Sequence, residues 1–209
     1  LLNMEDCKLF GAHNMENVMA ALAVGRVLRI PLEQMRQTIL AFEPPAHRCE
    51  RVAERGGVKF INDSKSTNPD SLEKALEAAP APNGEPNVLL IAGGKDKGLD
   101  YYSLGPTLAR RVKKAFLMGE TRDKLHASWS LFVPCEIVDS LAIAVDRAVD
   151  EARPEDVVLL SPGCASFDQF KNYRQRGDVF RQRVMDCLGP IVCEDGSKGS
   201  KEAGSRPST

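Results

Sequence analysis

The sequence has few of the features that mark secreted, membrane-bound or metal-binding proteins. Its six cysteines form no Cys-x-x-Cys pair, and its three histidines lack the spacing of a zinc site. No apolar run approaches the roughly 18–20 residues of a membrane-spanning helix, and the first residues do not resemble a signal peptide. With 28 basic and 29 acidic side chains, no charge excess favours nucleic acid or a membrane surface. We therefore expect a cytoplasmic protein with free thiols that holds no metal and binds neither nucleic acid nor membranes.

The composition is that of an ordinary globular protein with a polar end. The 209 residues are 43% hydrophobic and 27% charged, which predicts one or two domains with a sizeable core. Residues 191–209 are mostly Gly, Ser, Lys and Glu without an aromatic side chain. Because such a segment buries too little apolar surface to offset its ordering entropy, we expect a disordered tail there.

The first 45 residues show helical periodicity only. Apolar side chains recur every three or four positions over residues 14–28, and Asn14 suits the N-cap of this helix. A second helix is expected to start at Pro31 and to end before Pro44. Two helices do not make a domain, so residues 1–43 are expected to lie against the α/β domain, against a partner or against preceding chain, and we favour the last of these.

Residues 46–190 alternate strand and helix signals. Expected strands are 58–61, 88–92, 115–118, 136–138 and 157–160, and expected helices are 69–79, 103–111, 121–127, 140–152 and about 167–187. Such alternation predicts an α/β fold, a Rossmann-like, doubly wound and mostly parallel sheet whose apolar strands are covered on both faces. Trp129 is expected to pack at the surface between a helix and a strand.

Polar segments follow three of the expected strands, at residues 62–68, 93–98 and 161–170. The carboxyl ends of parallel strands share one edge, so we expect the three segments to form one rim. Lys65 and Lys97 would place two cations there. Ser166 suits a helix N-cap, with Gln169 completing a capping box, and a helix N-terminus binds anions. The pattern therefore predicts a site for a small anion, such as a dicarboxylate.

Each segment also has a purely structural interpretation. Asn68 can cap the helix that follows it, with Asp63 as a turn former, and Gly93-Gly94 can serve only a tight exit from the strand. Cys164 lies in the third segment, but no histidine is evidently its base, so a cysteine nucleophile is disfavoured.

At these segments the sequence resembles the Mur ligases of peptidoglycan precursor synthesis. The resemblance covers residues 11–184, most of the chain. It is carried by His13-Asn14-Met15-Glu16-Asn17, Ala46-His47-Arg48, Asn62 to Asn68, Gly93-Gly94-Lys95-Asp96-Lys97-Gly98, Leu160 to Tyr173 and Arg176-Gly177. The Asp-Ser-Lys-x-Thr-Asn element at 63–68 discriminates within the family, because it resembles the branch that adds D-glutamate.

The resemblance implies that the chain corresponds to the C-terminal half of a three-domain enzyme. Residues 1–45 would be the closing helices of a truncated central ATPase domain, and residues 46–190 the Rossmann-like domain that brings the amino acid. The family's phosphate loop, carbamylated lysine and UDP-binding domain are not in this sequence. ATP and Mg²⁺ are the implied cofactors, with the magnesium ligands in the missing N-terminal part, whose domains are implied partners.

The implied reaction adds D-glutamate to UDP-N-acetylmuramoyl-L-alanine through an acyl phosphate, although this chain alone would be inactive. A Mur-type ligase for another amino acid, or a non-catalytic module that binds a nucleotide or an amino acid, remains an alternative. The resemblance also implies a hinge at residues 43–48.

Roles for individual residues follow from the resemblance alone. For ATP the implied residues are Asn17, Arg48, Asp63 at the ribose, and Lys65, which would lie near the phosphates as the catalytic lysine. For D-glutamate they are Thr67 and Lys97 at the α-carboxylate, with Ser166 and the backbone around Tyr173 at the side-chain carboxylate. Four residues depart from the family pattern. Ser66 and Gly163 replace a frequent Ala, Tyr173 replaces a frequent Phe, and Arg174 replaces an acidic residue.

Overall fold

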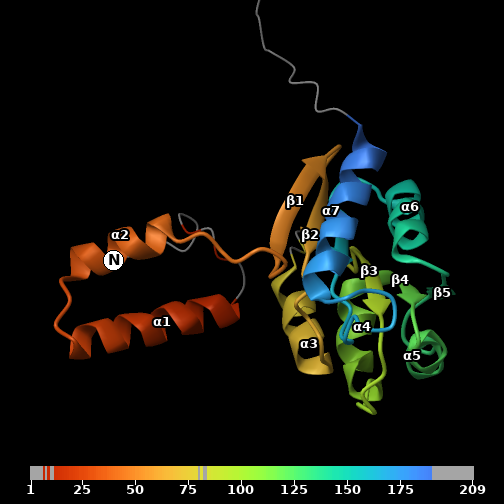
Figure 1. Cartoon of the computed structure of the whole chain (residues 1–209), viewed down its shortest axis with the longest axis horizontal. Coiled ribbons are helices and arrows are strands. Elements are labelled where there is room, and N and C mark those ends of the chain that lie inside the picture. Colours follow the sequence, from red (N-terminus) through yellow and green to blue (C-terminus); the bar gives the residue numbers. More distant parts are fainter. Residues whose placement is uncertain (1–6, 8, 10–11, 80, 82–83, 190–209) are drawn as a thin grey trace, which may run out of the picture.

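The computed structural model describes residues 7, 9, 12–79, 81 and 84–189, so the expected disordered tail at 191–209 lies outside the described residues. Within these ranges a helical hairpin projects from one side of an α/β domain (Figure 1). The hairpin consists of α1 (Ala12–Val27) and α2 (Leu32–Ala41). An extended stretch at residues 42–45 connects it to the sheet.

The two expected helices are present, but the expected N-cap of the first is wrong. α1 begins at Ala12, so Asn14 lies inside its first turn. The Asn14 Oδ1 atom accepts a hydrogen bond from Asn17 Nδ2 at 3.4 Å, a contact between neighbouring turns of the helix. Pro31 takes the N-cap position of α2, where its missing N–H is not required.

The sheet has six strands in the order β1-β2-β6-β3-β4-β5, and five of them are parallel. Their bounds are β1 (Glu50–Arg55), β2 (Val58–Asn62), β3 (Val88–Gly93), β4 (Val112–Met118), β5 (Cys135–Ile137) and β6 (Val157–Leu160). β1 is an antiparallel edge strand that the sequence analysis missed. Its polar sequence, Glu-Arg-Val-Ala-Glu-Arg, has no buried residue and therefore no apolar run.

Helices cover both faces of the sheet, which confirms the predicted doubly wound α/β fold. One face packs against α3 (Pro69–Ala78), α4 (Gly105–Arg111) and α5 (Arg122–Trp129), with the short 3₁₀ turn Tyr102–Leu104 before α4. The other face packs against α6 (Leu141–Glu151) and α7 (Tyr173–Leu188). All residues of β3 and β6 are buried because both of their faces are covered.

The start of α7 corrects the predicted helix 167–187. The helix begins at Tyr173, where the side chain of Asn172 accepts a hydrogen bond from Gln175 N at 3.0 Å. Ser166 is therefore not a helix N-cap; its carbonyl accepts from Phe170 N at 2.9 Å in an isolated turn. The helix therefore starts after its cap Asn172, and residues 167–172 stay irregular.

Trp129 also differs from expectation. Its side chain is fully buried in the core between the sheet and α3–α5, and its Nε1 donates to the Tyr101 carbonyl at 2.8 Å. The single indole N–H found a backbone acceptor, so the whole ring can be buried without an unpaired donor. Over the described ranges, no helix is both long and apolar enough to cross a bilayer.

Candidate functional site

The three polar segments lie side by side at one rim of the sheet, as the sequence predicts. β6 lies between β2 and β3, so the segments that follow these strands are neighbours. Gly93 N donates to Pro162 O at 2.9 Å, and Lys95 N donates to Ala165 O at 2.8 Å. This backbone pairing fixes the second segment against the third.

Gly93 and Gly94 have the structural role considered above, a tight exit from the strand. Gly93 and Gly94 have φ of 112° and 148°, a region that favours glycine. A Cβ on Gly93 would overlap the Met118 carbonyl oxygen, and one on Gly94 would overlap the Ala165 carbonyl oxygen. The pair therefore allows close approach of backbones and shows no phosphate-binding loop by itself.

Each of the three polar segments contributes one residue implied for D-glutamate: Thr67, Lys97 and Ser166. Lys97 Nζ donates to the Thr67 carbonyl at 3.1 Å, and the Lys97 side chain is otherwise exposed. Ser166 is buried directly after Ala165, which pairs with Lys95. The rim thus places one exposed ammonium group beside a hydroxyl-bearing loop, an arrangement suited to a carboxylate.

Asp63 is buried behind this rim, and protein donors already contact both of its carboxylate oxygens. Oδ1 accepts from Cys49 N at 3.1 Å, and Oδ2 accepts from Ser161 Oγ at 3.0 Å. Burial raises the pKa of Asp63 to about 6, against the opposing effect of these two hydrogen bonds. Asp63 therefore ties the turn before β1 to the end of β6.

Arg176 links the first polar segment to the third through hydrogen bonds, a role that the sequence analysis did not assign. Its guanidinium is fully buried and donates to Ser64 Oγ at 3.0 Å, Ser64 O at 2.9 Å and Cys164 O at 3.1 Å. Its Nη1 has no hydrogen-bond partner among the described residues. Burial lowers the pKa of Arg176 to about 10. The Arg176-Gly177 pair was the available signal, because it was quoted for the resemblance without a role.

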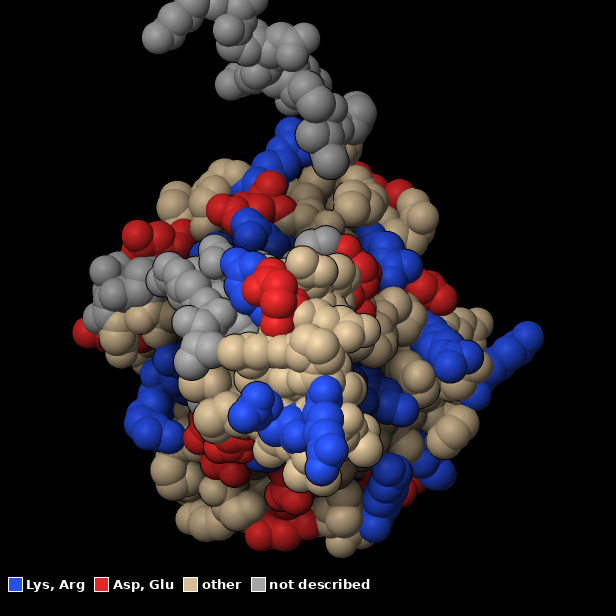
Figure 2. Space-filling model, turned by 90° about the vertical axis from the view of Figure 1, so that its left-hand side faces the viewer, with Lys and Arg blue, Asp and Glu red and all other residues tan. Residues whose placement is uncertain are grey.

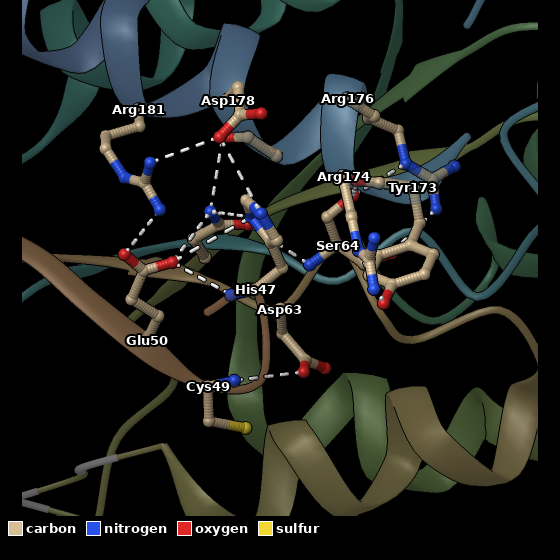
Figure 3. Close-up of polar contacts among 12 residues, drawn as sticks. His47, Cys49, Glu50, Asp63, Ser64, Tyr173, Arg174, Arg176, Asp178 and Arg181 are labelled. Carbon is tan, nitrogen blue, oxygen red and sulfur yellow. Dashed lines mark hydrogen bonds and ion pairs between the residues drawn. The ribbon is translucent and has the colours of Figure 1, made fainter. Parts of the chain in front are cut away.

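His47 anchors the turn between the hairpin and the sheet (Figure 3). Its ring is buried, with Nδ1 3.0 Å from Asn62 Nδ2, and its backbone N–H donates to Glu50 Oε2 at 2.9 Å. His47 Nε2 lies 3.7 Å from Asp178 Oδ1 on α7. A Cβ on Gly177 would overlap the imidazole, so the ring fits only against a glycine. This cluster fixes the end of the connecting stretch to α7.

Lys65 and Tyr173 meet above the same cluster. The Lys65 ammonium lies 4.3 Å from the centroid of the Tyr173 ring, and Lys65 N donates to His47 O at 2.9 Å. The carbonyl of Tyr173 accepts from Ser64 Oγ at 2.7 Å. Two residues implied for different ligands, the nucleotide and D-glutamate, are therefore in direct contact.

Asn17 and Arg48 line one cleft of about 420 Å³ between the hairpin and the start of the α/β domain. Apolar side chains form most of its other walls: Leu9, Val18, Ala21, Ile39, Phe42, Pro44 and Pro45. Cys49 also lines this cleft, and its backbone N–H donates a hydrogen bond to Asp63. Asp63 and Lys65 themselves do not line the cleft. An apolar cleft with an amide and a guanidinium at its edge fits the base of a nucleotide such as ATP.

Metal-ligating side chains are not clustered in the described part of the chain. Among residues 7, 9, 12–79, 81 and 84–189, no three His, Cys, Asp or Glu side chains are grouped to hold a metal ion. The described cysteines are free thiols, and burial raises the pKa of the Cys164 thiol, which disfavours a thiolate nucleophile there.

Sequence comparison identifies a family and relatives that share one name. Residues 47–164 match the model of the "Mur ligase, glutamate ligase domain" family. A protein of Acidobacterium capsulatum named UDP-N-acetylmuramoylalanine–D-glutamate ligase is 43% identical over 94% of this chain and 42% of its own length. A protein of the same name from Nitratidesulfovibrio vulgaris is 46% identical over 86% of this chain and 40% of its own length. The chain thus spans about two fifths of the curated relatives it matches.

Structural comparison shows the same fold in more distant proteins. The UDP-N-acetylmuramate–alanine ligase of Thermotoga maritima superposes with a TM-score of 0.65 at 16% identity, over 87% of this chain and 40% of that chain. The MurF ligase of Thermotoga maritima in complex with ADP superposes with a TM-score of 0.61 at 14% identity, over 85% of this chain and 40% of that chain. At these identities the likeness concerns the fold.

Proposed function

This chain belongs to the Mur ligase family, and we propose that it forms the acceptor-binding part of an ATP-dependent ligase that joins D-glutamate to UDP-N-acetylmuramoyl-L-alanine. The observation that carries the proposal is the shared rim of the three polar segments, where Lys97 and Thr67 are in contact. The names of the 43–46% identical relatives support D-glutamate as the amino acid. The proposal includes a cytoplasmic location.

In the proposed reaction, ATP supplies the phosphoryl group that activates the L-alanyl carboxylate as an acyl phosphate. The amine of D-glutamate then attacks this carbonyl, phosphate leaves and an amide forms. The rim would hold D-glutamate by its two carboxylates, with Thr67 and Lys97 at one and Ser166 with the backbone around Tyr173 at the other. Catalysis by this part of the enzyme would consist of positioning the amine.

The nucleotide would be held at the junction of the hairpin and the α/β domain. Asn17 and Arg48 line the cleft there, and an arginine suits a phosphate or a stacked base. Lys65 would meet the phosphates from the rim. Both carboxylate oxygens of Asp63 already accept a hydrogen bond, one from Cys49 N and the other from Ser161 Oγ. Asp63 would therefore contact the ribose through the remaining lone pairs of these oxygens. The Mg²⁺ ligands would lie in a part of the enzyme outside this chain.

A hybrid ligase tests the proposal directly. In it, this chain replaces the corresponding two fifths of the Acidobacterium capsulatum relative, and phosphate release from ATP is measured with UDP-N-acetylmuramoyl-L-alanine and one amino acid at a time. We expect release with D-glutamate, and none from this chain without the rest of the ligase. L-glutamate, D-aspartate and L-lysine serve as controls.

Two results would contradict the proposal. Preference for another amino acid would make this a Mur-type ligase with a different acceptor. No release from the hybrid, with equilibrium dialysis showing that the chain binds ATP or an amino acid, would favour a non-catalytic binding module.

A further inference from the structure

The Lys65 side chain has an unusual environment for a solvent-exposed lysine. Over the described part of the chain no carboxylate forms an ion pair with it, and its ammonium instead faces the ring of Tyr173 at 4.3 Å. A free lysine side chain samples many rotamers, and restricting it requires a compensating contact. A cation over an aromatic face supplies such a contact.

Tyr173 is itself held by three contacts, one to its backbone and two to its side chain. Ser64 Oγ donates to the Tyr173 carbonyl at 2.7 Å, which fixes the backbone. The imidazole of His47 meets the ring edge-on, with centroids 6.1 Å apart and an interplanar angle of 80°. Arg174 Nε donates to the phenolic oxygen at 3.3 Å (Figure 3). The ring is therefore a fixed platform, although it stands at the protein surface.

Arg174 also affects the charge around Lys65. Its guanidinium carbon lies 5.8 Å from the centroid of the same ring, so two cations share one aromatic side chain. The hydrogen bond from Arg174, with the nearby charges of Arg174 and Lys65 and a weaker hydrogen bond from Lys65, lowers the pKa of Tyr173. A carboxylate at position 174 would instead attract the Lys65 ammonium, because a charge-assisted hydrogen bond is stronger than an exposed cation–π contact.

We propose that the ring of Tyr173 is a positioning element for Lys65, holding its ammonium group over the rim where the phosphates and D-glutamate would meet. The inference rests on the proposed function for the role of Lys65, and it adds a role for the side chain of Tyr173 beside the backbone role already proposed. Arg174 acts through Tyr173 by fixing the phenol and by keeping the position free of negative charge.

The contact can be measured without any ligase activity. Protons above an aromatic ring are shielded, so the Lys65 ε-methylene protons resonate upfield in the NMR spectrum of the 209-residue protein. We expect this shift in the native protein and in Tyr173→Phe, and its loss in Tyr173→Leu. Tyr102→Leu, which removes an exposed ring packed against Phe132 rather than Lys65, is the matched control and keeps the shift. An ε-methylene resonance that is the same in the native protein and in Tyr173→Leu overturns the inference.

Arg174 provides a second test of the same contact. Arg174→Glu places a carboxylate beside Lys65 and is expected to abolish the upfield shift, whereas the neutral Arg174→Gln keeps it. If Arg174→Glu retains the full shift, charge at position 174 does not control Lys65 and that part of the inference is overturned.

A double-mutant cycle in the hybrid ligase tests whether the contact serves the reaction. We expect Tyr173→Leu to have a kcat roughly two- to fivefold below that of Tyr173→Phe, the loss of an exposed cation–π contact. In a Lys65→Met background the two Tyr173 variants should have the same kcat. An equal loss in both backgrounds overturns the inference. If phosphate release by the hybrid does not depend on D-glutamate, the proposed function is contradicted. The contact between the Tyr173 ring and the Lys65 ammonium is still tested by the NMR shift.

Discussion

At the scale of single residues, the site combines exposed groups with buried ones that support them. Lys97 is exposed and makes a single hydrogen bond to Thr67. Asp63, Arg176 and His47 are buried and hold the segments of the rim together. Substitutions of the two kinds should therefore have different effects. Loss of an exposed group changes ligand binding, whereas loss of a buried group changes the stability of the fold.

Lys97→Ala should weaken D-glutamate binding without unfolding the protein. A charge-assisted hydrogen bond to a carboxylate contributes about 1.5–3 kcal/mol, so the KM for D-glutamate in the hybrid ligase should rise roughly 10- to 100-fold. The free energy of unfolding should change by less than about 0.5 kcal/mol, because the side chain is exposed. Lys74→Ala on the exposed side of α3 is the matched control. An unchanged KM for D-glutamate would remove Lys97 from the site.

Asp63 should make stability fall as pH rises through the mildly acidic range. Its pKa is raised from 3.8 to about 6 by burial, so the folded state binds the proton more tightly than the unfolded state. The protein is therefore most stabilised by this group below about pH 4, and up to about 3 kcal/mol is lost as the pH rises past about 6. Asp63→Asn should lack this component.

The measurement is urea unfolding of both proteins between about pH 4 and pH 7. The quantity that matters is the difference between their unfolding free energies, since the other carboxylates titrate in both. A difference that does not change with pH would show that Asp63 has an ordinary pKa.

At the scale of secondary-structure elements, the local sequence predicted most helices and strands but not the ends that matter for the site. Asn68 caps α3 as expected, accepting from Ser71 N at 2.8 Å. At α7 two candidate caps compete, and Asn172 is used instead of Ser166. Both have suitable side chains, and the choice depends on where the chain returns to the sheet, which short-range patterns do not contain.

Removal of the cap should therefore destabilise α7 at Asn172. Asn172→Ala should lower the unfolding free energy by about 1 kcal/mol, which corresponds to about 2–4 °C in the melting temperature of a protein of this size. Asn172→Ser, which retains a capping oxygen, should lose only a few tenths of that energy. Melting temperatures followed by circular dichroism give the comparison. If Asn172→Ala melts with the native protein, the helix does not depend on this cap.

At the scale of the whole molecule, the hairpin and the α/β domain differ in how much they bury. Val18 and Met35 are the buried apolar residues of α1 and α2, while Met15, Met19, Val24, Val27, Leu28 and Leu32 are exposed. Viewed from the hairpin side, the surface has a broad uncharged area with basic side chains gathered below it (Figure 2). β3, in contrast, has no exposed residue.

This difference predicts unequal protection of backbone amides. In hydrogen exchange followed by mass spectrometry, peptides from α1 and α2 should exchange at least tenfold faster than the peptide that contains β3, because local opening of the hairpin exposes little additional apolar surface. In the hybrid ligase the hairpin peptides should become more protected. Protection of α1 equal to that of β3 in the 209-residue protein would contradict this account.

The α/β class, the parallel strands and the segments that form the rim could all be predicted from the amino-acid sequence. These follow from apolar periodicity and from strand-to-helix alternation, which are local patterns with a global consequence. The polar edge strand β1 was missed because it is only partly buried, with Val52 and Ala53 packed against the core, and therefore carries a weak apolar signal.

The buried groups that support the site could not be predicted in this way, because they depend on the folded arrangement of the chain. Burial of Asp63, Arg176 and Trp129 depends on hydrogen-bond partners that are distant in the chain, such as the Ser161 hydroxyl for Asp63 and the Tyr101 carbonyl for Trp129. The contact between Lys65 and Tyr173 joins a segment after β2 to one after β6, and the two lie close together because β6 pairs with β2 in the sheet. Polar groups become buried or paired through such long-range contacts, and patterns among neighbouring residues do not reveal these contacts.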